Sequence, residues 1–316
     1  MSASIGVDIG GTKVLAAVVD EGGRVIDTQT TPTPGPGSGV ERASVAEVED
    51  ALVEVVVALT ERHGRCSVGI AAAGFVDASG ERVRFAPHLP WRDEPLPAKL
   101  GDRLGDRVLG KVLVDNDANA ALWAEARFGA ARDARDAVML TLGTGIGGAI
   151  LAGGTLYRGR NGMAGEFGHM QVVPDGRPCE CGGRGCWEQY CSGRAVARAA
   201  TEAGSAFTGP ELTAAAQTGD PAAVAAYAEV GRWLGVGAAN VVAGLDPALV
   251  VVGGGASAAG DLLLDPARVA MAESLVGAGH RVLPDLLGAE LGPLAGVVGI
   301  ADLARPTSWR VPEGPS

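Results

Sequence analysis

The chain contains the same pattern twice, a β-strand that passes through a glycine turn into a second strand. The first copy covers residues 4–20 and turns at Gly10-Gly11, and the second covers residues 137–151 and turns within 143–148. Strand–turn–strand units of this kind, followed by helices, predict an α/β protein with mixed sheets and a nucleotide held between two lobes.

The spacing of apolar residues divides much of the remaining chain into helices and short strands. At 316 residues the chain is long enough for two lobes. The tail from Pro306 contains Pro and Gly and is predicted to be exposed. The predicted helices are 43–63, 120–127, 193–204 and 221–244, and the other predicted strands are 24–29, 68–72, 111–114 and 249–252.

The charge pattern argues against several classes of partner. The formal net charge is −11, and Lys and Arg form no cluster, so no nucleic-acid partner is expected. No basic start leads into an apolar run, so no signal peptide is expected. No apolar run reaches the length of a membrane span, so no membrane partner is expected either. The sequence therefore predicts a cytoplasmic protein.

The two glycine turns are similar to known phosphate-binding fingerprints without matching them. Gly6-x-x-x-x-Gly11-Thr12-Lys13 reverses the Lys-Thr order of a P-loop, and Gly143-Thr-Gly145-x-x-Gly148 contains the dinucleotide pattern. Both fingerprints require a helix next, whereas a strand is predicted here, so neither applies. Two hairpins with Thr alongside can still present bare N–H groups to phosphates; plain hairpin turns are the alternative.

A cluster of cysteines is the most specific local signal. Cys179, Cys181 and Cys186 fall within eight residues, and such spacing in a reducing cytosol predicts a metal site. Free buried thiols are the alternative. Glycines between the second and third cysteines let the backbone wrap tightly. His169 is the nearest histidine for a fourth ligand, and Cys191 competes with it. Four protein ligands would make a closed, structural zinc site.

Three consecutive polar residues, Asp115-Asn116-Asp117, follow a predicted strand and open a predicted helix. One of them is expected to cap the helix. Polar residues at the carboxyl end of a strand are also typical of α/β active sites, and either aspartate could be a general base. The other histidines, His63, His88 and His280, have no such context and are expected to be exposed or satisfied by hydrogen bonds.

Together these motifs resemble the ROK family of repressors, open reading frames and kinases, over nearly the whole chain from Ile5 to about Ala304. The resemblance implies an α/β, actin-like ATPase (ribonuclease H-like) fold, with two lobes and a nucleotide and sugar cleft between them. It implies a small lobe of 1–113 plus 299–316 and a large lobe of 114–298 that carries the zinc motif. A homodimer or homotetramer is implied as well.

The resemblance also implies roles for individual residues. Asp117 would be the catalytic base, and Asp8 would lie near Mg²⁺. Zinc would be bound by His169, Cys179, Cys181 and Cys186. The residues implied to bind the sugar are Gly74, His88, Asn116, Asp117, Glu166, His169 and Glu188. The residues implied to bind ATP are Asp8, Gly10, Gly11, Thr12, Lys13, Gly143, Thr144, Gly145, Gly253, Gly254 and Gly255.

Two positions depart from the family pattern. Ala73-Gly74 replaces the usual Pro-Gly, and His88 stands where relatives commonly place an Asn that grips the sugar. The role of His88 is therefore open.

The resemblance implies an enzyme that phosphorylates glucose at its 6-hydroxyl with ATP. A kinase for another hexose, such as N-acetylmannosamine, fructose or allose, is the alternative within the family. A sugar-sensing regulator is an alternative of another class, but the first phosphate motif begins at Asp8 and leaves no room for a DNA-binding domain before it. A zinc-stabilised interaction module would leave the glycine turns unexplained.

Overall fold

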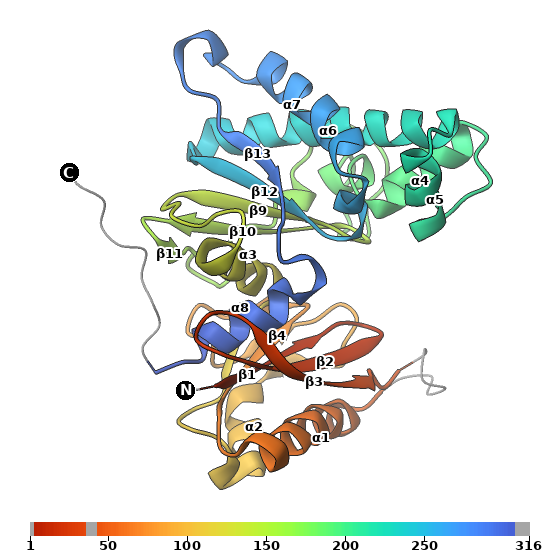
Figure 1. Cartoon of the computed structure of the whole chain (residues 1–316). Helices are drawn as coiled ribbons and strands as arrows, with labels where there is room; N and C mark the ends of the chain where they lie inside the picture. Colours follow the sequence, from red (N-terminus) through yellow and green to blue (C-terminus); the bar gives the residue numbers. More distant parts are fainter. Residues whose placement is uncertain (1–2, 36–42, 307–316) are drawn as a thin grey trace. The chain divides into compact units, whose positions relative to one another are not determined.

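The computed structural model describes residues 3–35 and 43–306, so most of the tail predicted to be exposed lies outside the described residues. The chain forms two compact units (Figure 1). The first unit consists of residues 1–133, 154–164 and 293–316, and the second of residues 134–153 and 165–292. The predicted lobe boundaries, 1–113 plus 299–316 and 114–298, stay a prediction.

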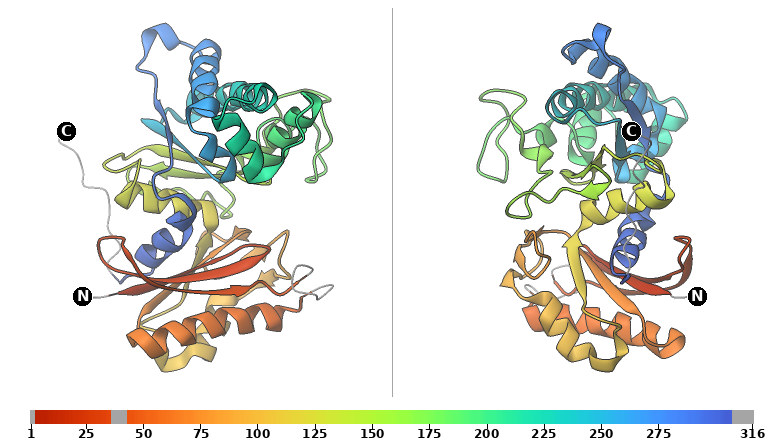
Figure 2. Two further views of the ribbon diagram at one scale, coloured as in Figure 1. Left: turned by 45° about the vertical axis from the view of Figure 1, so that its right-hand side comes forward. Right: turned by 90° about the vertical axis from the view of Figure 1, so that its left-hand side faces the viewer.

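The first unit contains a five-stranded sheet with the order β3-β2-β1-β4-β8. Its strands β1 and β2 are antiparallel, whereas β1, β4 and β8 are parallel neighbours. Helices α1 and α2 cover one face of this sheet and α3 and α8 lie on the other (Figures 1 and 2). The strands are β1 (Ser4–Ile9), β2 (Lys13–Val19), β3 (Val25–Pro32), β4 (Ser67–Ala72) and β8 (Leu113–Asn116); the helices are α1 (Val45–His63), α2 (Leu96–Leu104), α3 (Asp117–Phe128) and α8 (Ala295–Leu303).

A second five-stranded sheet has the order β11-β10-β9-β12-β13. Again the glycine turn joins an antiparallel pair, β9 and β10, and the strands on the other side of β9 are parallel to it. Helix α6 packs against α7, α4 and α5. The elements are β9 (Ala137–Leu142), β10 (Ile146–Ala152), β11 (Thr155–Leu156), β12 (Leu249–Gly253), β13 (Asp285–Gly288), α4 (Gly193–Glu202), α5 (Gly209–Gln217), α6 (Pro221–Leu245) and α7 (Asp261–Ser274).

The two sheets confirm the repeated unit predicted from the sequence, because both place a glycine hairpin beside parallel strands in the same order. Strand β2 follows the first turn and β10 follows the second, so the exclusion of the P-loop and dinucleotide fingerprints is also confirmed. The sequence did not predict α2, α5, α7 or α8. A small sheet, also not predicted, consists of β5 (Phe75–Val76), β6 (Val83–Phe85) and β7 (Arg92–Glu94).

Helix α8 completes the core of the first unit. A Cβ atom on Gly6 of β1 would collide with the Val297 carbonyl oxygen, and one on Gly69 of β4 would collide with that of Ile300. The backbone of α8 therefore lies directly on the two central strands, where only glycine leaves room for it.

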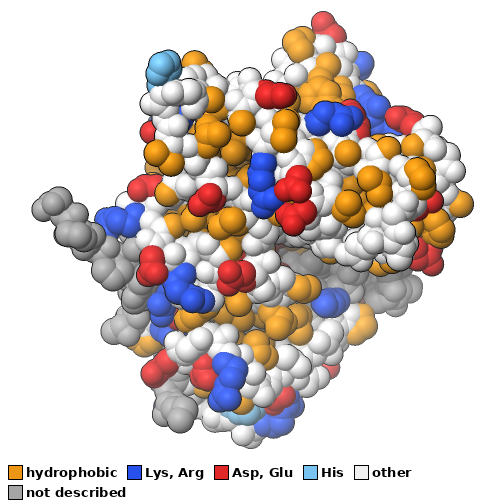
Figure 3. All heavy atoms as spheres, turned by 45° about the horizontal axis from the view of Figure 1, so that its top comes forward, with side chains coloured by type: hydrophobic (Ala, Val, Ile, Leu, Met, Phe, Trp, Pro, Cys, Tyr) orange, Lys and Arg blue, Asp and Glu red, His pale blue; other side chains and the backbone are white. Residues whose placement is uncertain are grey.

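The surface carries mixed charge on the face shown in Figure 3, where Lys and Arg side chains lie among Asp and Glu. Among the helices of residues 3–35 and 43–306, none is both long and apolar enough to cross a membrane.

Candidate active site and metal centre

Two carboxylates, Asp8 and Asp117, mark the candidate catalytic centre of the first unit. Asp8 lies in β1 and Asp117 is the first residue of α3, so both are placed by the parallel strands of one sheet. Burial raises the pKa of Asp8 to about 7; the negative charge of Asp117 adds to this shift and Lys13 opposes it. Burial also raises the pKa of Asp117, and the N–H of Ala118 opposes that shift.

Asn116 is the residue that caps α3. Its Oδ1 accepts the N–H groups of Ala118 and Asn119, at 2.9 Å and 3.2 Å, and its Nδ2 donates to the Gly74 carbonyl at 3.1 Å. The structure thus brings two predicted sugar ligands, Gly74 and Asn116, into contact. The cap fixes the backbone from which the Asp117 side chain projects.

Asp115 is only 2% exposed, and its bonds are to protein groups. Its Oδ2 accepts from Arg158 Nε at 3.0 Å, and its Oδ1 accepts from Asn119 Nδ2 at 2.8 Å. From the sequence alone, either Asp115 or Asp117 could be the general base. This geometry gives Asp115 a structural role and leaves Asp117, which is partly exposed, as the better candidate. Arg158 was not recognised from the sequence because 43 residues separate it from Asp115.

The first glycine turn is held by a neighbouring strand end. Gly10 N–H donates to the Lys13 carbonyl at 3.2 Å, and the Thr33 hydroxyl donates to the Gly10 carbonyl at 2.8 Å. Gly11 and Thr12 are exposed and can present their backbone to a ligand. His88 is also exposed, and its Cβ would lie 3.4 Å from a Cβ atom on Gly11. His88 is therefore a neighbour of the first glycine turn.

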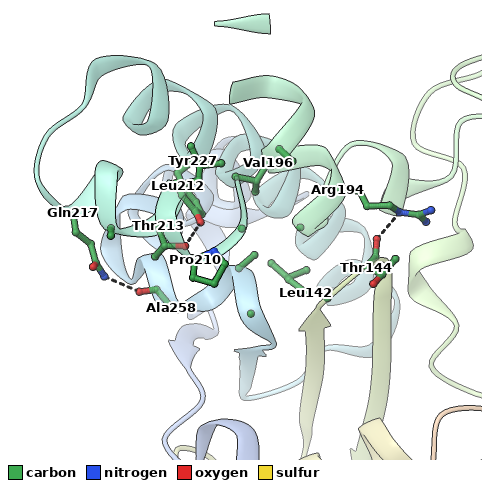
Figure 4. A pocket seen from close by; sticks show the side chains of 17 residues that line it. Leu142, Thr144, Arg194, Val196, Pro210, Leu212, Thr213, Gln217, Tyr227 and Ala258 are labelled. Atoms are coloured by element: carbon green, nitrogen blue, oxygen red, sulfur yellow. Dashed lines mark hydrogen bonds between the residues drawn. The ribbon is translucent and has the colours of Figure 1, made fainter. Parts of the chain in front are cut away.

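The second unit contains a pocket of about 640 Å³ beside the second glycine turn (Figure 4). Three predicted nucleotide residues, Gly143, Thr144 and Gly255, line it. Much of the remaining lining comes from α4 and α5, which the nucleotide motifs did not indicate: it includes Arg194, Val196, Ala197, Pro210, Leu212, Thr213 and Gln217, together with Tyr227 of α6. A largely apolar slot with a few polar groups suits a planar base.

The other predicted nucleotide glycines have different neighbours. A Cβ atom on Gly253 would contact Met139, and one on Gly254 would collide with the backbone of Leu142. These two glycines pack β12 against β9. Gly145 is covered by Glu188, whose Oε2 would collide with a Cβ atom there.

Three cysteines and one histidine form the candidate metal centre, also in the second unit. One ligand atom from each of His169, Cys179, Cys181 and Cys186 lies within 4.8 Å of every other. The Cys181 and Cys186 sulfurs are 3.6 Å apart, and His169 Nδ1 is 3.8 Å from Cys179 Sγ. This grouping favours His169 over Cys191 as the fourth ligand.

The donor set fits zinc. Zinc–sulfur bonds of about 2.3 Å in a tetrahedral site place two sulfur ligands about 3.8 Å apart, close to the 3.6 Å between the Cys181 and Cys186 sulfurs. Burial raises the pKa of the Cys186 thiol to about 12 and also raises that of Cys179, whereas the Gly183 N–H lowers that of Cys181. A cation at the centre of the four atoms would therefore favour ionisation of the two buried thiols.

The predicted sugar ligands of the second unit surround this centre. The Nε2 of His169 faces Glu166 Oε2 at 3.9 Å, and its Nδ1 faces Glu188 Oε1 at 4.0 Å as well as Cys179. Glu188 Oε1 also accepts from the Cys179 thiol at 3.1 Å. One histidine thus joins the metal centre to two carboxylates suited to sugar hydroxyls.

A family model for the ROK family matches residues 4–307. The chain belongs to the ROK family. A glucokinase of Streptomyces coelicolor is 44% identical over 96% of this chain and 98% of its own length, and a glucokinase of Halalkalibacterium halodurans is 34% identical over 93% and 92%. The fold is similar to the crystal structure of a ROK family glucokinase from Streptomyces griseus in complex with glucose and AMPPNP, with a TM-score of 0.85. The two sequences are 44% identical, and the match covers 97% of this chain and 100% of that one. Membership of the ROK family confirms the predicted two-lobed, actin-like ATPase fold.

Proposed function

We propose that this chain is an ATP-dependent glucokinase that transfers the γ-phosphate of ATP to the 6-hydroxyl of glucose. The observation that carries the proposal is the contrast between Asp115, which is bound to Arg158, and Asp117, which is partly exposed beside the capping residue Asn116. The similarity to the Streptomyces glucokinases over nearly the whole chain supports the choice of substrates.

Asp117 is the proposed general base. The burial that raises its pKa makes its carboxylate a better proton acceptor than that of an exposed aspartate. Asp8, with Lys13 nearby, is proposed to lie on the phosphate side, where Mg²⁺, when bound, would offset the charge of the phosphates. Phosphoryl transfer depends mainly on such positioning and charge, so a single base is sufficient.

Glucose is proposed to bind through Gly74, His88, Asn116, Asp117, Glu166, His169 and Glu188. Zinc, when bound, would hold His169 and the loop that carries Glu188 in fixed register. The nucleotide is proposed to place its base in the pocket of about 640 Å³ and its phosphates on the glycine turns. We further propose a homodimer or homotetramer located in the cytoplasm.

The test is a coupled assay of ADP release with ATP and a panel of hexoses. Glucose should have the highest kcat/KM, and N-acetylmannosamine should be a poor substrate, because several carboxylates are available for free hydroxyls. A panel in which N-acetylmannosamine, fructose or allose exceeds glucose would reassign the substrate. A panel without any turnover would support the sensor alternative.

A further inference from the structure

Arg194 is a residue of α4 that the motifs did not assign to any role. It follows Gly193, the first residue of the helix, and it lines the nucleotide pocket (Figure 4). Its Nε donates to the Thr144 carbonyl at 2.8 Å, across 50 residues of sequence. The Gly193 N–H donates to the adjacent Gly143 carbonyl at 2.8 Å. The start of α4 therefore holds two successive carbonyl groups of the second glycine turn, which is called the phosphate turn below.

The other nitrogens of the same guanidinium face the sugar side of the unit. Arg194 NH1 donates to Glu180 Oε1 at 2.6 Å, and Glu180 lies between the zinc-loop residues Cys179 and Cys181. Arg194 NH2 is 3.9 Å from Glu188 Oε1, the proposed sugar carboxylate. A single planar side chain thus contacts the phosphate turn, the zinc loop and a sugar ligand.

Glu188 and the phosphate turn are also close to each other without Arg194. The carboxylate of Glu188 covers Gly145, and a Cβ atom there would lie 2.1 Å from Glu188 Oε2. Glu188 is only 8% exposed, so its carboxylate is packed against its neighbours and moves when the turn or Arg194 moves. A movement of the turn at 143–145 should therefore also shift the Glu188 carboxylate.

We propose that Arg194 is a positioning residue that couples nucleotide binding to glucose binding. The inference rests on the proposed glucokinase function. Phosphates on the turn would fix the Thr144 carbonyl, and this would immobilise the rigid guanidinium fork and the Glu188 carboxylate beside it. Glucose would then bind to a Glu188 carboxylate that is already ordered. The affinity for glucose rises because the entropy cost of ordering this carboxylate was met when the nucleotide bound. Linkage requires glucose to raise nucleotide affinity by the same factor.

The matched control is Arg268 in α7. Its Nε also donates to a backbone carbonyl, that of Leu286, at 3.2 Å, and its NH1 pairs with two carboxylates. Its side chain is 40% exposed, compared with 39% for Arg194. Arg268→Met should therefore remove a comparable set of bonds without touching the phosphate turn.

The experiment measures the glucose dissociation constant by calorimetry with and without AMPPNP and Mg²⁺, in the unaltered enzyme, Arg194→Met, Arg194→Lys and Arg268→Met. AMPPNP should tighten glucose binding by about 5- to 50-fold in the unaltered enzyme and in Arg268→Met. The factor should fall to about 2-fold or less in Arg194→Met, with an intermediate value in Arg194→Lys, which keeps the charge and loses the fork. Zinc content and thermal unfolding, measured on each variant, separate lost coupling from lost structure.

If coupling is absent from the unaltered enzyme, or if Arg194→Met retains it in full, the inference is overturned while the proposed function still stands. Loss of coupling in Arg268→Met to the same extent overturns it too. An unaltered enzyme that binds AMPPNP and not glucose contradicts the proposed function, and the inference with it.

Discussion

The carboxylate of Asp115 is bound to the guanidinium of Arg158, with Oδ2 3.0 Å from Nε. This pair separates two aspartates that the sequence presents as equivalent, because the second, Asp117, opens α3 and keeps some contact with solvent. The same isosteric substitution, Asp to Asn, should therefore have different effects at positions 115 and 117.

Asp117→Asn should lower kcat by at least ~10²-fold, since an amide keeps the shape of the side chain but cannot accept the proton. Glucose affinity, measured by calorimetry, should change much less. Asp115→Asn should instead lower the free energy of unfolding by about 1–3 kcal/mol, because it weakens the bond to Arg158, while kcat stays within about 10-fold. Near-normal turnover in Asp117→Asn would show that Asp117 is not the general base.

His169→Ala should lower the zinc content measured by elemental analysis, whereas Cys191→Ser should retain near one zinc per chain. The reason is that His169 lies with the three clustered cysteines, and Cys191 is fully buried in the apolar core outside that group. Removal of zinc with a chelator should also lower the unfolding temperature of the unaltered enzyme. An unchanged zinc content in His169→Ala, together with loss of zinc in Cys191→Ser, would show that Cys191 is the fourth ligand and His169 is not.

Asp8→Asn should stabilise the ligand-free protein above neutral pH. The pKa of Asp8 is about 7 in the folded protein, well above the ordinary value of an aspartate. Between about pH 4 and pH 7 the unfolded chain has therefore lost a proton that the folded chain keeps, so stability falls as the pH rises through this window. The substitution removes that loss and should raise the free energy of unfolding by roughly 1–3 kcal/mol at pH 8.

The same variant should gain much less at pH 4, where the folded protein keeps the proton and the unfolded chain still keeps part of it, and it should be nearly inactive. Thermal unfolding at the two pH values measures the difference. An equal gain at pH 4 would mean that the effect does not come from ionisation of Asp8.

Ala197→Phe should raise the KM for ATP by about 10-fold or more, because the larger side chain fills the pocket that Ala197 lines. Glucose affinity without nucleotide should be unchanged. Ala203→Phe, at the exposed end of the same helix, is the control and should leave both constants unaltered. Equal effects of the two substitutions would place the nucleotide base elsewhere.

The repeated hairpins and the cysteine cluster could be predicted because their signals are local. The turn at Gly10-Gly11 and the spacing from Cys179 to Cys186 each lie within a few residues. Arg158 and Arg194 could not be found in this way, because their partners Asp115 and Thr144 are 43 and 50 residues away. No periodicity or spacing in a single sequence indicates which of 26 basic residues reaches which carbonyl or carboxylate.

Helix α8 was missed for a different reason. Its residues 295–303 contain two glycines and are apolar on nearly every side, so they lack both the polar face and the propensity that indicate a helix. Tertiary packing decides its structure. A Cβ atom on Gly299 would collide with the Ala120 carbonyl of α3, just as Gly6 and Gly69 give way to α8.

This position of α8 sets an order of events on the ribosome. Strands β1 and β4 are made early, yet the helix that lies on them is made only after the entire second unit. The nascent chain therefore carries this face of β1 and β4 without α8 throughout most of its translation, and the first unit can complete its packing only when synthesis is nearly finished. A stop codon or frameshift shortly before residue 295 would leave the second unit fully encoded and still deprive the first of the helix that packs on β1 and β4.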